Sequence, residues 1–119
     1  MTSSLSKRPR VDETGRAAQV FRMMSLPLTD SEIVHALTHL PGWVFERDAL
    51  VKTLKFKDFR EAMAFMLKAG FEADSMNHHP EWTNVYNKVV IKLTTHDAGN
   101  RVTAKDVELA GKMEVLAGK

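Results

Sequence analysis

Residues 74–106 read DSMNHHPEWTNVYNKVVIKLTTHDAGNRVTAKD, and three of the five histidines of the chain fall in this stretch. His78 and His79 are followed at once by Pro80, whose ring disfavours the helical region for the residue before it. We therefore expect His79 to be extended and a preceding helix to end by about residue 77 or 78. The third histidine, His96, follows a strand pattern. Histidine titrates closest to neutral pH, so three of them in one stretch point to proton transfer.

Working outward, residues 82–95 alternate between apolar and polar side chains, which predicts a second hairpin or one long kinked strand. On this pattern the core face carries Val85, Val89, Ile91 and Leu93. Tyr86 and His96 then fall together on the other face. Residues 97–100 form a turn, and Thr103 with Asp106 predicts a capping box that begins a last helix.

The chain before this stretch contains two helices and one hairpin. Thr29 and Glu32 predict a capping box, and apolar residues at helical spacing follow until Pro41-Gly42 stops the helix. Residues 43–45 and 50–56 read as two strands joined by a polar turn. Asp58 and Glu61 predict the cap of the longest helix. Its apolar stripe, which we expect to be core rather than a cofactor site, comprises Phe59, Ala62, Met63, Met66 and Ala69, widened by Phe65 and Leu67.

The element order α-β-β-α-β-β-α predicts an α+β fold, in which a four-stranded antiparallel sheet has three helices packed on one face. The two open edges of so small a sheet favour pairing with a second copy, so a homodimer or homotetramer is expected.

Composition narrows the function classes. A chain of 119 residues with 44% hydrophobic residues supports one modest core. The absence of cysteine excludes disulfide scaffolds and thiol nucleophiles. A net charge of +2 argues against direct nucleic-acid binding. No apolar run approaches the roughly 20 residues of a membrane helix, and no signal peptide is visible. A cytoplasmic protein is therefore expected, with an additional nuclear location as the alternative.

Residues 1–25 are polar and differ from the rest, so we interpret them as a flexible N-terminal tail, followed by one domain at residues 26–119. Lys7, Arg8 and Arg10 form a short basic cluster in the tail. The cluster is compatible with a nuclear-localisation patch, but its few charges favour a solvated tail.

The spacing of seven residues identifies a family. The pattern begins with an acid, three intervening residues and His-His-Pro. It continues with five residues, an aromatic, nine residues, a histidine and a later aspartate. The residues that match it are Asp74, His78, His79, Pro80, Tyr86, His96 and Asp106. From about Leu28 to the C-terminus the chain resembles the pterin-4a-carbinolamine dehydratase family, which also appears as the dimerisation cofactor of a homeodomain transcription factor. The resemblance implies a hydro-lyase that dehydrates 4a-hydroxytetrahydrobiopterin to quinonoid dihydrobiopterin, recycling the cofactor of aromatic amino-acid hydroxylases.

The resemblance also implies roles for residues. His78 and His96 would be the acid–base pair, and His79 would bind and orient the pterin. Asp74, Pro80 and Trp82 join His79 as substrate-binding residues, while Asp106 and Tyr86 form a supporting shell. No metal and no organic cofactor is expected. The alternative is a dimerising binding module whose partner is a transcription factor or a hydroxylase.

Three assignments stay open at this point. The histidines are compatible with a zinc site, although adjacent histidines rarely reach one metal without strain. Asp74 lies in the last turn of a helix, where the helix dipole disfavours an acid, so it either pairs with an imidazole or ligand or is simply exposed. Asp106 is explained by the cap alone, and Tyr86 by packing alone.

Overall fold

The computed structural model describes residues 25–118, so the predicted tail and its basic cluster lie almost wholly outside the described residues. The order is that expected from the sequence, with a short 3-10 helix added before the last helix. The elements are α2 (Asp30–Leu37), β1 (Val44–Glu46), β2 (Ala49–Lys55), α3 (Phe59–Ser75), β3 (Glu81–Val85), β4 (Lys88–Leu93), η1 (His96–Ala98) and α4 (Ala104–Gly118).

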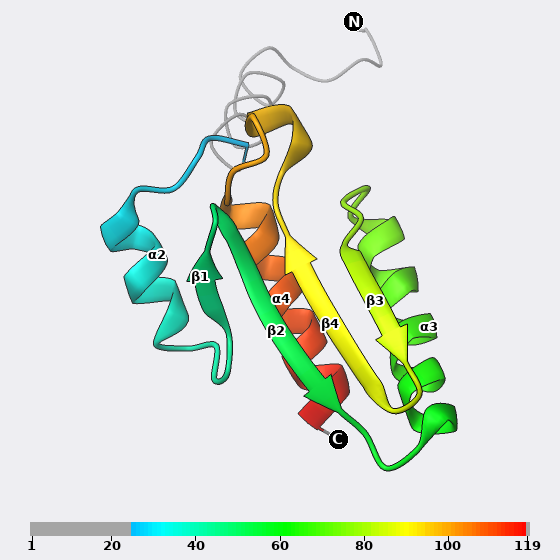
Figure 1. The fold of residues 1–119 in the computed structure, drawn as a ribbon. Coiled ribbons are helices and arrows are strands. Elements are labelled where there is room, and N and C mark those ends of the chain that lie inside the picture. Colours follow the sequence, from blue (N-terminus) through cyan, green and yellow to red (C-terminus); the bar gives the residue numbers. More distant parts are fainter. Residues whose placement is uncertain (1–24, 119) are drawn as a thin grey trace, which may run out of the picture.

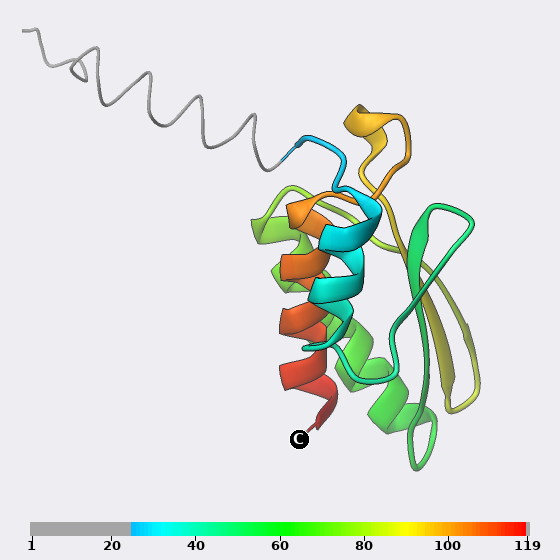
Figure 2. The ribbon, with the colours of Figure 1, turned by 90° about the vertical axis from the view of Figure 1, so that its left-hand side faces the viewer.

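The four strands form one antiparallel sheet in the order β1-β2-β4-β3, and the helices form a second layer on one face of it, as predicted (Figures 1 and 2). Both hairpins turn through two residues. Arg47 and Asp48 join β1 to β2 with φ of 51° and 63°, values typical of the tight turns whose twist matches that of the strands. The end of α3, the end of β4 and the start of α4 meet at one end of the molecule.

The core lies between the two layers. The inward positions of the central strands are paired across the sheet, with Leu50 opposite Leu93 and Lys52 opposite Ile91. Leu109, Ala110 and Met113 of α4 are buried against them. Lys52 is the polar exception on this face, and its ammonium group reaches the Glu114 carboxylate of α4, which also accepts a bond from Trp43 Nε1 at 2.8 Å. This ion pair links α4 to the face of the sheet that it covers.

The capping signals of the first two helices are confirmed in different degrees. Thr29 and Glu32 form both bonds of a capping box at the start of α2. At α3, Asp58 accepts from the Glu61 backbone N–H at 2.9 Å, but the Glu61 carboxylate accepts from Lys57 instead of closing the box. Each cap satisfies N–H groups that the first helical turn leaves without a partner.

One strand residue was assigned to the wrong face. Val85 was expected in the core but is 67% exposed. The turn at Tyr86 and Asn87 ends β3 immediately after it, and Val85 pairs with the exposed Lys88. Directly opposite residues share a face, so Val85 points away from the helices. β3 also alternates, but its half-buried positions are Trp82 and Asn84. The expected core positions are confirmed within β4, where Val89, Ile91 and Leu93 are buried.

The buried stripe of α3 also differs from the expected one. The buried residues are Ala62, Phe65, Ala69 and Ala73. Phe59, Met63 and Leu67, which we expected in the core, are 46%, 45% and 60% exposed. The helix is apolar on more than one side, and three alanines together with Phe65 form its buried face. No helix among residues 25–118 is long and apolar enough to cross a membrane.

Candidate functional site

The end of α3 sets the position of His78. Asn77 adopts φ of 52°, in the left-handed region, and its N–H donates to the Asp74 carbonyl at 2.9 Å. The His78 N–H donates to the Ala73 carbonyl at 3.0 Å. These two bonds form a Schellman motif, in which the left-handed residue ends the helix and the following backbone folds back onto it. The helix therefore ends where Pro80 predicted, and the backbone of His78 is fixed by the helix itself.

His96 lies just beyond β4 rather than in the strand. Thr95 forms an isolated antiparallel bridge with Arg101, and His96 begins η1. Gly99 closes this turn with φ of 73°, a conformation that glycine adopts at little cost. The bridge anchors Thr95, while the side chain of His96 is exposed at the turn.

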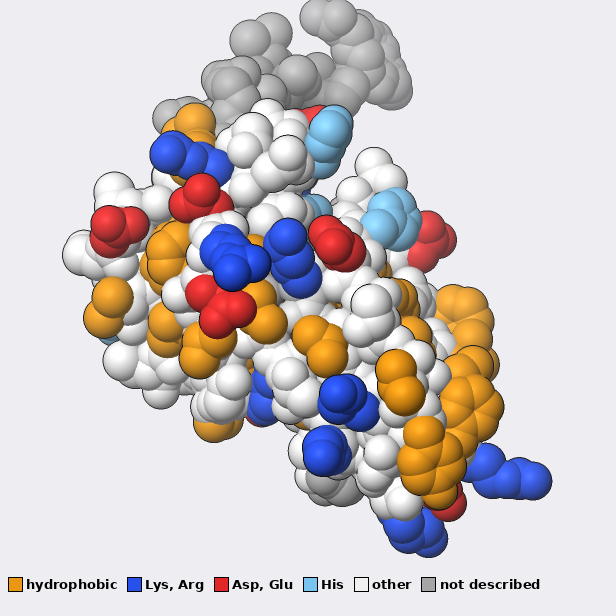
Figure 3. Space-filling view, in the orientation of Figure 1, with side chains coloured by type: hydrophobic (Ala, Val, Ile, Leu, Met, Phe, Trp, Pro, Cys, Tyr) orange, Lys and Arg blue, Asp and Glu red, His pale blue; other side chains and the backbone are white. Residues whose placement is uncertain are grey.

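These segments enclose a cleft of about 290 Å³. It lies between the end of α3 and η1, and Figure 3 shows histidine side chains on either side of this hollow. The volume is near the lower limit of small-molecule pockets. The lining is polar throughout and consists of Asn77, His78, His79, Thr94, Thr95, His96, Asp97 and Lys105. Such a lining favours a small ligand that is recognised by hydrogen bonds.

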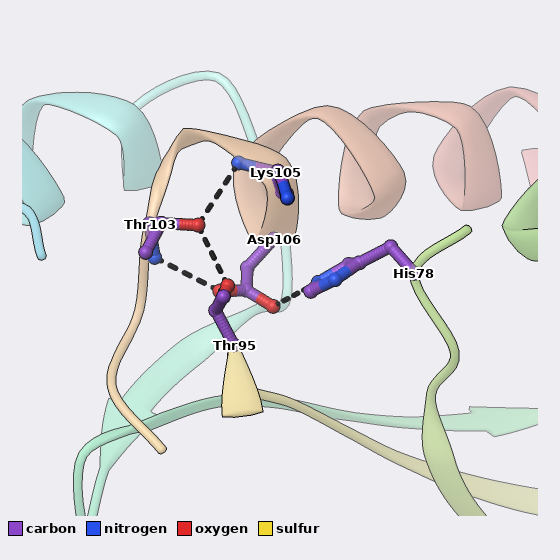
Figure 4. Close-up of polar contacts among 5 residues, drawn as sticks. All are labelled: His78, Thr95, Thr103, Lys105 and Asp106. Carbon is purple, nitrogen blue, oxygen red and sulfur yellow. Dashed lines mark hydrogen bonds and ion pairs between the residues drawn. The ribbon is translucent and has the colours of Figure 1, made fainter. Parts of the chain in front are cut away.

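A buried carboxylate forms hydrogen bonds to two residues that line the cleft (Figure 4). Asp106 is 0% exposed, and its Oδ1 lies 2.6 Å from Nε2 of His78. Its Oδ2 accepts from the Thr95 hydroxyl at 2.7 Å and from the Thr103 N–H at 2.8 Å. The Thr103 contact is the backward bond of the predicted cap. Asp106 therefore has the structural role we expected and, in addition, holds one of the three histidines.

His79 has a different carboxylate partner. Its Nε2 lies 3.2 Å from Oδ1 of Asp74, and the two side chains are 60% and 80% exposed. Of the alternatives left open for Asp74, both hold in part, because the acid pairs with an imidazole and is also solvent-exposed. Exposed pairs contribute little stability, so the contact orients His79 more than it strengthens the fold.

The structure brings together only some of the predicted site residues. All three histidines line the cleft, whereas Pro80, Trp82 and Tyr86 do not. Trp82 is half-buried and packs against α3, where its Cη2 would lie 3.9 Å from a Cβ at Gly70. Tyr86 is 62% exposed in the turn between β3 and β4, at the opposite end of β4 from His96. Neither aromatic residue is among those that line the cleft.

Several cleft residues were not predicted. Thr94, Thr95 and Asp97 flank His96, and Asn77 precedes His78, so their proximity to the histidines was an available signal. Lys105 enters from the start of α4 and carried no such signal.

A zinc site is not supported by the described residues. Within residues 25–118 there is no group of three or more His, Cys, Asp or Glu side chains arranged to hold a metal ion. His35 of α2 and His39, two residues after its end, are exposed and lie edge to face.

Comparison with known proteins places these features in a family. The family model for pterin 4 alpha carbinolamine dehydratase matches residues 26–116. A relative from Opitutus terrae, named provisionally as a pterin-4-alpha-carbinolamine dehydratase, is 58% identical over 90 residues, covering 76% of this chain and 93% of its own. A similarly named relative from Solibacter usitatus is 49% identical, covering 79% and 98%. A crystal structure from Brucella melitensis, described as a transcriptional coactivator/pterin dehydratase, superimposes with a TM-score of 0.73 at 46% identity, covering 77% of this chain and 99% of that one.

Proposed function

Because the chain belongs to the pterin 4 alpha carbinolamine dehydratase family, we propose that it removes water from 4a-hydroxytetrahydrobiopterin to give quinonoid dihydrobiopterin. The observation that carries the proposal is the convergence of His78, His79 and His96 on one polar cleft. In this role the protein recycles the pterin cofactor of aromatic amino-acid hydroxylases.

The chemistry needs two proton transfers. Hydroxide is a poor leaving group from carbon, so the departing oxygen must receive a proton. A proton on a ring nitrogen must also leave as the new double bond forms. An imidazole can perform either transfer, and each is typically worth roughly 10²–10⁴-fold in rate. His78 and His96 are the acid–base pair in this proposal, and His79 binds the pterin ring. No metal or organic cofactor takes part.

Steady-state kinetics of purified variants test the proposal. Changing His78 or His96 to alanine should lower kcat by roughly 10²–10⁴-fold with a smaller change in KM. His79→Ala should mainly raise KM. The double variant at His78 and His96 should fall to near background, because both residues act on one reaction.

His39→Ala is the matched control, since His39 is an exposed histidine that follows the end of α2 and lies outside the cleft. It should retain wild-type kinetics. Circular dichroism should show that every variant is folded. Wild-type turnover in a folded His96→Ala protein would refute the mechanism.

Self-association is part of the proposal, and the exposed side of α3 supports it. Phe59, Met63, Leu67 and Phe71 recur every four residues and are between 45% and 67% exposed. Figure 3 shows hydrophobic side chains gathered over α3. Exposed apolar stripes of this kind mark interaction surfaces. A stripe that runs along a helix is complementary to its own copy across a two-fold axis, so the proposed occupant is α3 of a second chain.

The second candidate function is a dimerising binding module that acts on a transcription factor. The same α3 stripe is a surface for such a partner, and the Brucella melitensis structure is described as a transcriptional coactivator as well as a pterin dehydratase. The kinetic test separates the two candidates, because a binding module does not require turnover.

A further inference from the structure

The hydroxyl groups of Thr95 and Thr103, beside Asp106, form a chain of hydrogen bonds in which each donor can be assigned. The Lys105 N–H donates to Thr103 Oγ1 at 3.2 Å, and Thr103 Oγ1 lies 2.6 Å from Thr95 Oγ1. The Thr95 hydroxyl donates its single proton to Asp106 Oδ2, so the Thr103 hydroxyl supplies the proton between the two threonines. Thr95 and Thr103 are 3% and 0% exposed, so solvent does not supply alternative partners.

The Asp106 carboxylate decides which nitrogen of His78 carries a proton. The Asp106 carboxylate accepts from Thr95, from the Thr103 N–H and from His78, and it has no proton to give back. Nε2 of His78 is therefore the protonated nitrogen. A neutral imidazole has one N–H and one acceptor nitrogen, which leaves Nδ1 as the acceptor. No described residue is hydrogen-bonded to Nδ1, and His78 lines the cleft.

Building on the proposed function, we propose that His78 is the base of the reaction and acts through Nδ1, and that Thr95 and Thr103 are positioning residues that hold it in this state. Nδ1 takes the proton from the pterin ring nitrogen as its electron pair forms the new double bond. The resulting imidazolium is stabilised by the adjacent Asp106 carboxylate, as in other carboxylate–histidine pairs.

The assignment leaves the acid to His96. Its ring has no carboxylate hydrogen-bonded to it among the described residues, and it is exposed at the turn of η1. As an imidazolium, His96 donates a proton to the departing hydroxyl oxygen while the carbon–oxygen bond breaks. The substrate thus loses one proton and one hydroxide, and one water forms. After each turnover, His78 releases the proton it has accepted to solvent, and His96 takes up a proton from solvent.

The positioning role has a distinct signature in Thr95 variants. Thr95→Val keeps the shape of the side chain and removes the hydroxyl, whereas Thr95→Ser keeps the hydroxyl. A hydrogen bond to a charged group is typically worth enough to change a rate by roughly tenfold to a hundredfold. We expect Thr95→Val to lower kcat by that factor with little change in KM, and Thr95→Ser to stay close to wild type.

Nitrogen NMR of histidine-labelled protein reads the tautomer without any turnover. The wild-type spectrum should show a proton on Nε2 of His78 and none on Nδ1, and Thr95→Val should show a mixture of the two tautomers. The measurement is made well below the melting temperature, and Thr103→Ser against Thr103→Val repeats it at the second hydroxyl. A wild-type His78 protonated at Nδ1 would overturn the proposal, as would a folded Thr95→Val protein with wild-type kcat and tautomer.

The two readouts separate this inference from the function on which it rests. A wild-type chain without dehydratase activity would overturn the proposed function and the base assignment with it. The NMR spectrum would still decide whether Thr95 and Thr103 position His78, because it depends only on the protein.

Discussion

Replacing Asp106 distinguishes a residue that only caps a helix from one that holds a buried cluster. A lost cap interaction alone costs on the order of 1 kcal/mol. In the structure, Asp106→Ala leaves three buried donors without an acceptor, namely His78 Nε2, the Thr95 hydroxyl and the Thr103 N–H. Each unsatisfied buried group costs roughly 1–3 kcal/mol.

The expected loss for Asp106→Ala is therefore about 3–5 kcal/mol in the free energy of unfolding, with the lower end favoured if water enters from the cleft. For a domain of this size each kcal/mol lowers Tm by about 4–8 °C, so Tm should fall by at least roughly 12 °C. Asp106→Asn keeps an acceptor oxygen and should cost less stability. It should still lower kcat by roughly 10²–10⁴-fold, because an amide can donate to His78 and reverse its tautomer.

Urea unfolding followed by circular dichroism measures the stability, and steady-state dehydration kinetics measure the turnover. Asp58→Ala is the matched control, since Asp58 caps α3 through a single bond to the Glu61 N–H and lies outside the cleft. It should cost only about 1 kcal/mol and leave kcat unchanged. If Asp106→Ala and Asp58→Ala lose the same free energy, the buried cluster contributes nothing beyond a cap and our reasoning is wrong.

Four further outcomes are expected. Asn77→Val should lose about 1–2 kcal/mol of stability in urea unfolding, because a β-branched residue is strained at the positive φ of this position, whereas Asn77→Gly should not. Incubation with a chelator should leave turnover unchanged; activity lost and then restored by zinc would contradict a metal-free reaction. Leu67→Asp with Phe71→Asp should yield a monomer in sedimentation velocity, while Val115→Asp, an exposed apolar residue of α4 outside the stripe, should not change the assembly. Deleting residues 1–24 should preserve Tm and turnover, and a large fall in Tm would move the domain boundary toward the N-terminus.

Local signals in the sequence predicted most of the fold. Thr29 with Glu32 and the His-His-Pro stop act within a few residues, and α2 begins and α3 ends where they predict. Pro41-Gly42 predicted the end of α2 less closely, because the helix already ends at Leu37. The face of Val85 was not predictable from alternation, because the two-residue turn after it restarts the pattern. The side of α3 that would be buried was also not predictable, since the helix carries large apolar residues on more than one side.

The candidate site was predicted as a set of residues but not as an arrangement. The histidines could be found from their spacing. Asp106 and His78, however, are 28 residues apart, and no local sequence pattern predicts their contact. The partner of Asp74 follows from the left-handed turn at Asn77, which directs the chain so that His79, rather than His78, meets the acid. Trp82 was predicted to lie near the ligand because of its aromatic ring; it packs against α3 and is not among the residues that line the cleft.

The unequal burial of the histidines constrains how this protein can change during evolution. His78 is 7% exposed and shares a hydrogen-bonded cluster with Asp106, whereas His79 and His96 are exposed. A substitution at His78 or Asp106 would break the buried hydrogen bond between them as well as the proposed chemistry, so selection for a stable protein opposes that route. Substitutions at His79 or His96 would remove the proposed catalytic groups from an otherwise intact scaffold. A lineage that kept only a binding role would therefore diverge first at the exposed rim of the cleft and retain the buried histidine and its carboxylate.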